Sequence, residues 1–299
     1  NGGSLTPGTD GRTIEDLETL STEELIDYVR RRLRWYVPQP VKRVEIPKGN
    51  GKTRPLGIPT IADRLVQQCF LQVLEPICEA KFHDRSYGFR PLRSAQNAMA
   101  VYYKYIQLMD LYYVVDVDIK GFFDNINHGK LLRQMWSIGI RDKKVISIIS
   151  AMLKAEVAGI GFPEKGTPQG GIISPLLANI YLHELDKFVR KLKNEFDTHG
   201  QEPVRTEYRL LSNEIQKLSY HIGRSTGAEK ERLLEEYNRK RKLMLKMPCT
   251  AQTNKRLKYI RYADDFILGV KGSKEDCQWM KSKKSEFISG TMKMELSEE

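Results

Sequence analysis

Two strand-like segments that carry aspartates at their ends limit the folds open to this chain. The first, 111–119, reads Leu-Tyr-Tyr-Val-Val-Asp-Val-Asp-Ile, which predicts a buried strand with Asp118 near its end. The second, 257–270, places Asp264 and Asp265 between two apolar runs, which predicts a β-hairpin with the acidic pair at its tip. Carboxylates at a strand end and at a hairpin tip can converge at one point.

Converging carboxylates suit the binding of divalent cations. Mg²⁺ takes hard oxygen ligands and keeps several waters, so two or three carboxylates are enough. A two-metal site clamps the attacking and leaving oxygens of a phosphoryl transfer, and a cation removes the repulsion between clustered carboxylates. Aspartate also favours turns. On spacing alone, metal ligands and plain turn residues fit Asp264 and Asp265 equally well.

Two other segments are marked by turn residues and by charge. Residues 41–47 and 53–58 alternate around the turn 49–51, which predicts a hairpin and not a P-loop, because Ile46 stands where that motif needs glycine. Residues 201–260 hold 14 Lys or Arg against 7 Asp or Glu. We expect a basic helical hairpin inserted at about 201–256, whose charges suit either a solvated surface or contact with phosphates.

The composition favours a soluble, intracellular protein with a polyanionic partner. The net charge is +11, and Lys and Arg neutralise phosphates. No apolar run approaches the roughly 18 residues of a membrane span. The four cysteines are scattered, which predicts neither a zinc site nor disulfides.

Three motifs, in this order along the chain, resemble those of reverse transcriptases. Residues 118–126 (Asp-Ile-Lys-Gly-Phe-Phe-Asp-Asn-Ile) are similar to the motif with the first catalytic carboxylate. Residues 166–179, which begin Gly-Thr-Pro-Gln-Gly-Gly, resemble the loop and helix beneath the templating base pair, and 262–265 (Tyr-Ala-Asp-Asp) resemble the motif with the other two carboxylates. Stretches 6–11, 46–59 and 86–91 narrow the resemblance to group II intron reverse transcriptases, which are also maturases.

The resemblance implies an α+β, right-hand polymerase fold, with an antiparallel palm sheet that carries helices and with interleaved fingers. The N-terminal extension and fingers would take residues 1–107 and 125–164. The palm would take 108–124, with the first metal-binding motif, and 165–299, which include the basic insertion. Family members continue into a primer grip and a thumb, and we expect the thumb to be absent from these 299 residues. We therefore expect this stretch to bind RNA and to be weakly active or inactive in primer extension.

The resemblance also implies a two-metal Mg²⁺ site. Asp118, Asp264 and Asp265 would be the catalytic residues. Asp118 and Asp264 would bind the ions directly, the carbonyl of Ile119 would complete a metal shell, and Asp265 would lie near the primer end.

Further roles carried over by the resemblance concern the nucleotide and RNA. Lys48 and Arg54 would hold the triphosphate, Phe123 would exclude a ribose 2′-hydroxyl, and Gln169 would lie beside the incoming nucleotide. The basic insertion would contact RNA through Arg239, Lys240, Arg241 and Lys242.

The implied activity is RNA-directed DNA synthesis with a DNA primer and deoxynucleoside triphosphates, together with binding of group II intron RNA for splicing and mobility. Two alternatives are an RNA-binding splicing maturase without polymerase activity and a retron or diversity-generating reverse transcriptase. The three intact aspartates favour the polymerase, and the N-terminal extension and insertion favour the intron type. We expect a bacterial cytoplasmic protein, or an organellar one, with no membrane partner. A monomer and a homodimer both remain open.

Overall fold

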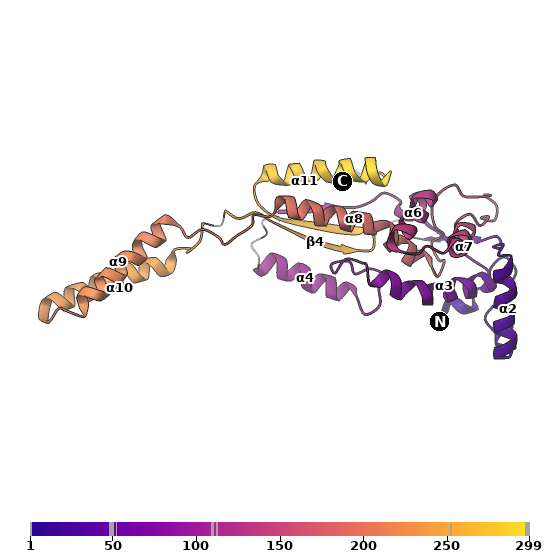
Figure 1. Ribbon diagram of the computed structural model, residues 1–299, viewed down its shortest axis with the longest axis horizontal. Coiled ribbons are helices and arrows are strands. Elements are labelled where there is room, and N and C mark those ends of the chain that lie inside the picture. Colours follow the sequence, from indigo (N-terminus) through magenta and orange to yellow (C-terminus); the bar gives the residue numbers. More distant parts are fainter. Residues whose placement is uncertain are drawn as a thin grey trace.

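A three-stranded antiparallel sheet lies at the centre of the molecule (Figure 1). The computed structural model describes residues 2–47, 51, 53–108, 111, 113–251 and 253–296. The strands, in the spatial order β3-β5-β4, are β3 (Tyr113–Val117), β5 (Asp265–Lys271) and β4 (Arg256–Tyr262). The expected mixture of helices and antiparallel sheet is therefore present.

Helices cover both faces of this sheet. Helices α8 (Ser174–Phe196) and α11 (Lys274–Glu286) lie on one side and α4 (Ala95–Leu108) on the other (Figure 1). Alternating side chains explain the two layers, because successive residues of a strand point to opposite faces. Phe266 and Leu268 join the main core with α8, whereas Ile260 joins a smaller core with α4.

The remaining elements surround this centre. The short helices are η1 (Gly2–Leu5), α1 (Glu15–Glu18), α5 (Phe122–Asn125) and the π-helical η2 (Phe287–Met292). The longer ones are α2 (Thr22–Arg34), α3 (Ile61–Glu79), α6 (His128–Ile138) and α7 (Lys143–Leu153). Strands β1 (Lys42–Pro47) and β2 (Thr53–Ile58) form the expected antiparallel hairpin. No helix in the described part of the chain is long and apolar enough to span a membrane.

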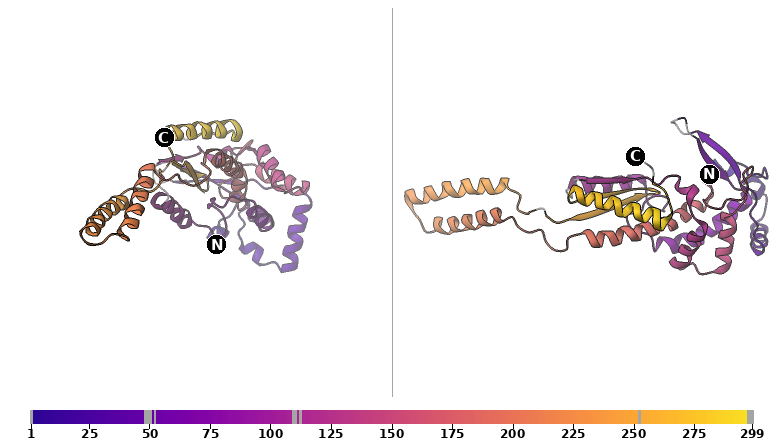
Figure 2. Two further views of the ribbon diagram at one scale, coloured as in Figure 1. Left: turned by 60° about the vertical axis from the view of Figure 1, so that its left-hand side comes forward. Right: turned by 90° about the horizontal axis from the view of Figure 1, so that it is seen from above.

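The basic insertion is a helical hairpin that projects from the body. It consists of α9 (Thr206–Ile222) and α10 (Gly227–Lys246), which pack on each other. Figure 1 and Figure 2 show it extending away from the sheet, at the end opposite the β1–β2 hairpin. Two chain segments at its base are joined by a hydrogen bond from the Arg205 amide to the Cys249 carbonyl, at 3.0 Å.

One expectation about the sheet was wrong. Segment 111–119 was expected to form a buried strand, but among the described residues β3 pairs only with β5, which makes it an edge strand with part of its side chains exposed. Tyr113 and Val114 are exposed and Val115 is buried. Apolar, β-branched composition predicted the strand correctly, but it does not distinguish an edge from a centre, which depends on segments distant in the sequence.

Candidate active site

The acidic pair lies at a two-residue hairpin turn. Tyr262 of β4 pairs with Asp265 of β5, so Ala263 and Asp264 form the turn between them. Ala263 has φ of +55°, a left-handed conformation that is uncommon for residues other than glycine. Turns with positive φ match the twist of a two-residue hairpin. The backbone around Asp264 is therefore held in a conformation that its neighbours must stabilise.

The third aspartate reaches the same end of the sheet through the strand register. β3 runs antiparallel to β5, with Val117 opposite Phe266. One more residue along this register places Asp118 opposite Asp265. The backbone then continues beside the C-terminal segment, where Ile119 forms a bridge with Leu296. The structure thus brings together the three aspartates expected from sequence.

The negative charges of these carboxylates act on one another. Burial raises the pKa of Asp264 above its ordinary value, and the charge of Asp118 raises it further, whereas the charge of Arg54 lowers it. Burial also raises the pKa of Asp265, with added repulsion from Asp264 and Asp118. A cation among the three would relieve this repulsion.

The donor set fits a hard divalent cation that shares its shell with a substrate. Carboxylate oxygens are the ligands that Mg²⁺ prefers, and Mg²⁺ keeps several waters or takes substrate phosphate oxygens. Across the described ranges, no group of three His, Cys, Asp or Glu side chains is already arranged around one point. The aspartates therefore offer the chemistry for metal binding without a complete protein cage.

A buried ion pair supports the turn from below. The guanidinium of Arg261 and the carboxylate of Asp186 on α8 are almost fully buried and 2.9 Å apart. Arg261 also donates to the carbonyl of Ala263, at 2.8 Å, and to the side chain of Asn179. Burial alone would raise the pKa of Asp186, but Arg261 holds that pKa below its ordinary value. This pair links the acidic turn to α8.

A second support comes from the segment before α4. The Tyr87 amide donates to the Arg261 carbonyl, and the Arg261 amide donates to the Arg85 carbonyl, both at 2.9 Å. This segment thus lies along β4 beside the turn. A Cβ atom on Gly88 would lie 2.1 Å from the amide nitrogen of Ala263, so only glycine fits there.

Sequence reasoning missed the supporting role of these residues. Arg261 and Asp186 are 75 residues apart, and no local pattern joins them. The only signals were Arg261 beside the acidic motif and Gly88 within the stretch 86–91.

Phe123 follows the first aspartate through a sharp turn. Gly121 has φ of +55° and precedes the short helix α5, whose first residues are Phe122 and Phe123. The ring of Phe123 is half-buried and meets Phe122 and Phe89 edge-on, with centroid distances of 5.4 and 6.1 Å. Phe89 is itself exposed and has positive φ. The rings of Phe89 and Phe123 therefore meet at the segment that follows β3 and Asp118.

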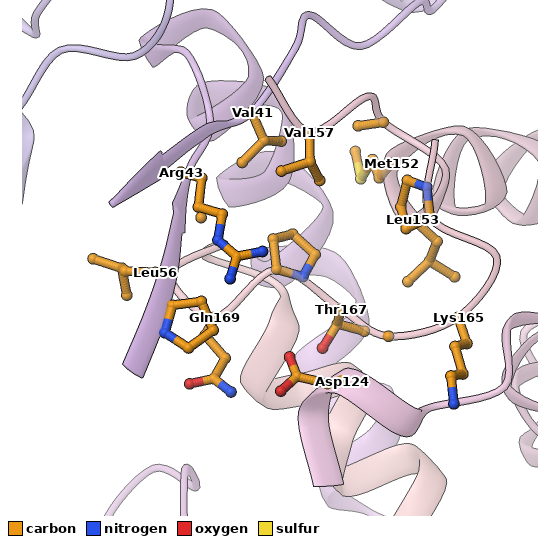
Figure 3. A pocket seen from close by; sticks show the side chains of 16 residues that line it. Val41, Arg43, Leu56, Asp124, Met152, Leu153, Val157, Lys165, Thr167 and Gln169 are labelled. Carbon is orange, nitrogen blue, oxygen red and sulfur yellow. The ribbon is translucent and has the colours of Figure 1, made fainter. Parts of the chain in front are cut away.

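Gln169 lies between the β1–β2 hairpin and the body. Its carbonyl accepts a hydrogen bond from the Gly57 amide of β2, at 2.7 Å. Its side chain borders a pocket of about 320 Å³, shown in Figure 3. There the polar ends of Gln169, Asp124 and Thr167 gather at one end, and apolar side chains such as Val157 form the other.

Of the two cations expected to hold the triphosphate, the structure describes Arg54 but not Lys48. Arg54 is exposed on β2, and its charge partly opposes the rise in the pKa of Asp264. Lys48 lies outside the described residues.

The four cations expected to contact RNA lie on α10. Arg239, Arg241 and Lys242 are exposed. Lys240 is turned inward and pairs with Glu236 at 2.9 Å and with Glu214 of α9 at 3.1 Å. Its charge therefore joins the two helices of the hairpin.

Comparison with known proteins gives the site a context. The profile of the family described as "Reverse transcriptase (RNA-dependent DNA polymerase)" matches residues 46–201. That stretch includes Asp118, Phe123 and Gln169 and ends before the acidic turn.

Three curated proteins show the range of similarity. The group II intron-encoded protein LtrA of Lactococcus lactis subsp. cremoris is 47% identical over 310 residues, which cover 100% of this chain and 50% of LtrA. Protein YkfC of Escherichia coli K12 is 34% identical, and the match covers 99% of this chain and 71% of YkfC. Nuclear intron maturase 2 of Arabidopsis thaliana is 24% identical over 79% of this chain and 35% of its own length. The chain spans about half the length of LtrA.

Proposed function

Because this chain belongs to the reverse transcriptase family, and within it to the group II intron-encoded type, we propose that it copies RNA into DNA at the β4–β5 turn. The observation that carries the proposal is the meeting of Asp118 with Asp264 and Asp265 at one end of the sheet. In this reaction a primer 3′-hydroxyl attacks the α-phosphorus of a deoxynucleoside triphosphate and pyrophosphate leaves.

The arrangement of the elements supports the right-hand polymerase fold that the resemblance implies. The sheet with α8 and α11 would be the palm, formed by residues 108–124 and 165–299. Residues 1–107 and 125–164, with the projecting β1–β2 hairpin, would be the fingers. The α9–α10 hairpin would be an appendage of the palm.

Roles at the site follow from position and chemistry. Two Mg²⁺ ions, when bound, would hold the attacking and leaving oxygens. Asp118 and Asp264 would hold these ions, with help from the Ile119 carbonyl, and Asp265 would lie toward the primer end. Arg54, with Lys48, would neutralise the triphosphate, because a guanidinium forms strong hydrogen bonds with phosphate oxygens. Gln169 would border the incoming nucleotide.

Addition of a single nucleotide tests this function directly. A DNA primer annealed to an RNA template is incubated with an excess of the protein, so that one addition suffices. We expect incorporation of the templated deoxynucleotide that depends on Mg²⁺ and stops with EDTA. If RNA is bound but no nucleotide is added, the alternative of a splicing maturase without polymerase chemistry gains support.

Phe123 gives a prediction about sugar selectivity. Replacing Phe123 with alanine removes the ring expected to clash with a ribose 2′-hydroxyl. The preference for deoxynucleotides over ribonucleotides should fall by about tenfold or more, since steric discrimination of this size is typical of a shaped pocket. Rates of addition of each nucleotide measure it. Phe123→Tyr keeps the ring and should keep the preference; equal selectivity in all three proteins would remove this role from Phe123.

The projecting α9–α10 hairpin favours a second function, the binding of intron RNA. Arg239, Arg241 and Lys242 are exposed cations on one helix, away from the acidic turn. A-form RNA is bound mainly through its backbone, for which such cations suffice. The relatives named for introns and maturases are consistent with this use.

RNA binding by the α9–α10 hairpin can be tested with its exposed cations, and Lys240, which is turned inward, serves as the control. Replacing Arg239, Arg241 and Lys242 with alanine should weaken RNA binding and flatten its salt dependence by up to about 2 to 3 units of slope. Lys240→Gln should instead destabilise the hairpin, because Glu214 and Glu236 lose their partner. Anisotropy titrations over a range of salt measure the slope. An unchanged slope in the triple variant would make these cations part of a solvated surface only.

A further inference from the structure

A polar cleft of about 410 Å³ lies on the side of the body that α8 covers. It is bounded by α6, α8 and the end of η2. Three of its lining residues are cations, Lys130, Arg133 and Lys293, and one is an acid, Glu184. The cleft therefore concentrates positive charge.

The surrounding protein offsets only part of this positive charge. Glu184 already pairs with Lys187, at 3.2 Å. Arg133 and Lys293 are exposed, and no carboxylate in the described part of the chain forms an ion pair with either. Burial lowers the pKa of Lys130, and repulsion from Arg133 and Lys293 lowers it further, whereas the charge of Glu184 raises it. Such crowding of cations favours an anion in the cleft.

A buried amide in the same cleft lacks one partner. Gln134 is only 6% exposed, and its amide nitrogen donates to the Tyr181 carbonyl at 3.3 Å. Its Oε1 atom is buried and accepts no hydrogen bond from any described residue. A buried acceptor without a donor is unfavourable by about 1 to 3 kcal/mol. A ligand that brings a hydroxyl donor next to an anion would satisfy both features.

The cleft lies away from the acidic turn. On β5, Ile267 and Gly269 face α4, since they line a narrow space with Tyr105 of that helix. Asp265 has the same parity along the strand, so it belongs to the α4 face. Glu184 belongs to α8, which covers the opposite face. A ligand in the cleft is therefore separate from nucleotides at the aspartates.

We propose that this cleft binds the sugar–phosphate backbone of RNA, an inference that rests on the proposed function only in taking RNA as a partner. Arg133 and Lys293 contact phosphates, and Lys130, whose ammonium donates to the Thr291 carbonyl, adds positive charge beside them. Gln134 Oε1 accepts a hydrogen bond from a ribose 2′-hydroxyl, the group that distinguishes RNA from DNA. The bound strand is one that the protein grips and does not copy.

The charge part of the proposal is tested by salt dependence. A fluorescein-labelled RNA stem-loop is titrated with the full chain, without Mg²⁺ or nucleotides, so the outcome is independent of polymerisation. Arg133→Ala with Lys293→Ala should lower the slope of log K against log salt by about 1 to 2 units. The matched control, Lys143→Ala with Lys144→Ala, removes two exposed cations of α7. Equal slopes for the two variants would overturn the proposal.

The hydroxyl part is tested by Gln134→Met. This variant keeps the side-chain volume and removes the unpartnered acceptor, so thermal unfolding should change little. RNA affinity should fall by about fivefold, while affinity for the DNA stem-loop of the same sequence should not change. Equal losses for RNA and DNA, or no loss for RNA, would contradict recognition of the ribose.

Discussion

Replacing Asp264 and Asp265 together with alanine is expected to lower the rate of templated nucleotide addition by at least about a thousandfold. The variant lacks two of the three carboxylates that meet at the turn. Without them, the charge that develops on the reacting phosphate loses the cations that would stabilise it, and losses of this size follow removal of single stabilising groups. Single-nucleotide addition with the protein in excess measures the rate.

Two controls separate lost chemistry from lost structure. Glu235→Gln removes an exposed carboxylate of α10, on the projecting hairpin, and should leave the rate nearly unchanged. The alanine variant should also be no less stable than the parent. The pKa values of Asp264 and Asp265 are raised in the folded state. Their ionisation therefore opposes folding as pH rises above the ordinary aspartate value, and alanine removes this penalty at neutral pH. A parent-like rate in the alanine variant would contradict the assignment.

The second large effect concerns stability. Replacing Arg261 with methionine should lower the free energy of unfolding by about 3 to 5 kcal/mol, because Asp186 would stay buried without its partner. The Ala263 carbonyl and Asn179 would lose a donor as well. Urea unfolding, compared with the parent at equal pH, measures the difference.

A double variant shows what the buried pair does beyond stability. Arg261→Met with Asp186→Leu replaces both charges with apolar groups, which is often neutral or stabilising. Stability should therefore recover, although the Tyr259 hydroxyl loses its carboxylate acceptor. Nucleotide addition should stay low, because the Ala263 carbonyl then lacks its hydrogen bond from Arg261. If the double variant regains both stability and the parent's rate, the pair does not position the turn.

The local elements of the fold could be predicted from the sequence. Ser21 and Glu24 form a capping box on α2, a pattern that the sequence itself shows because both partners of that motif lie within one turn. The acidic β-hairpin was predicted because apolar runs flank a short polar turn, and its two strands pair as expected. The three aspartates meet for the same reason, because a strand end and a hairpin tip lie together once the strands pair.

Features that depend on distant segments could not be predicted. The burial of Asp186 depends on Arg261, and the fit of Gly88 depends on the backbone of Ala263. Lys240 looked like its three neighbours in a basic run, but the packing of α9 against α10 turns it toward Glu214. The position of Lys240 around its helix does not predict this orientation, since it does not identify the helix that packs against α10. The edge position of β3 was missed for a similar reason.

Locating a bound metal tests the central claim most directly. Fe²⁺ replaces Mg²⁺ at oxygen sites, and with ascorbate and peroxide it produces hydroxyl radicals that cut the backbone nearby. If the aspartates bind the metal, the parent should be cut near Asp118 and near Asp264, excess Mg²⁺ should suppress both cuts, and the double alanine variant should show neither. Cuts elsewhere, or the same cuts in the alanine variant, would contradict a metal site at the β4–β5 turn.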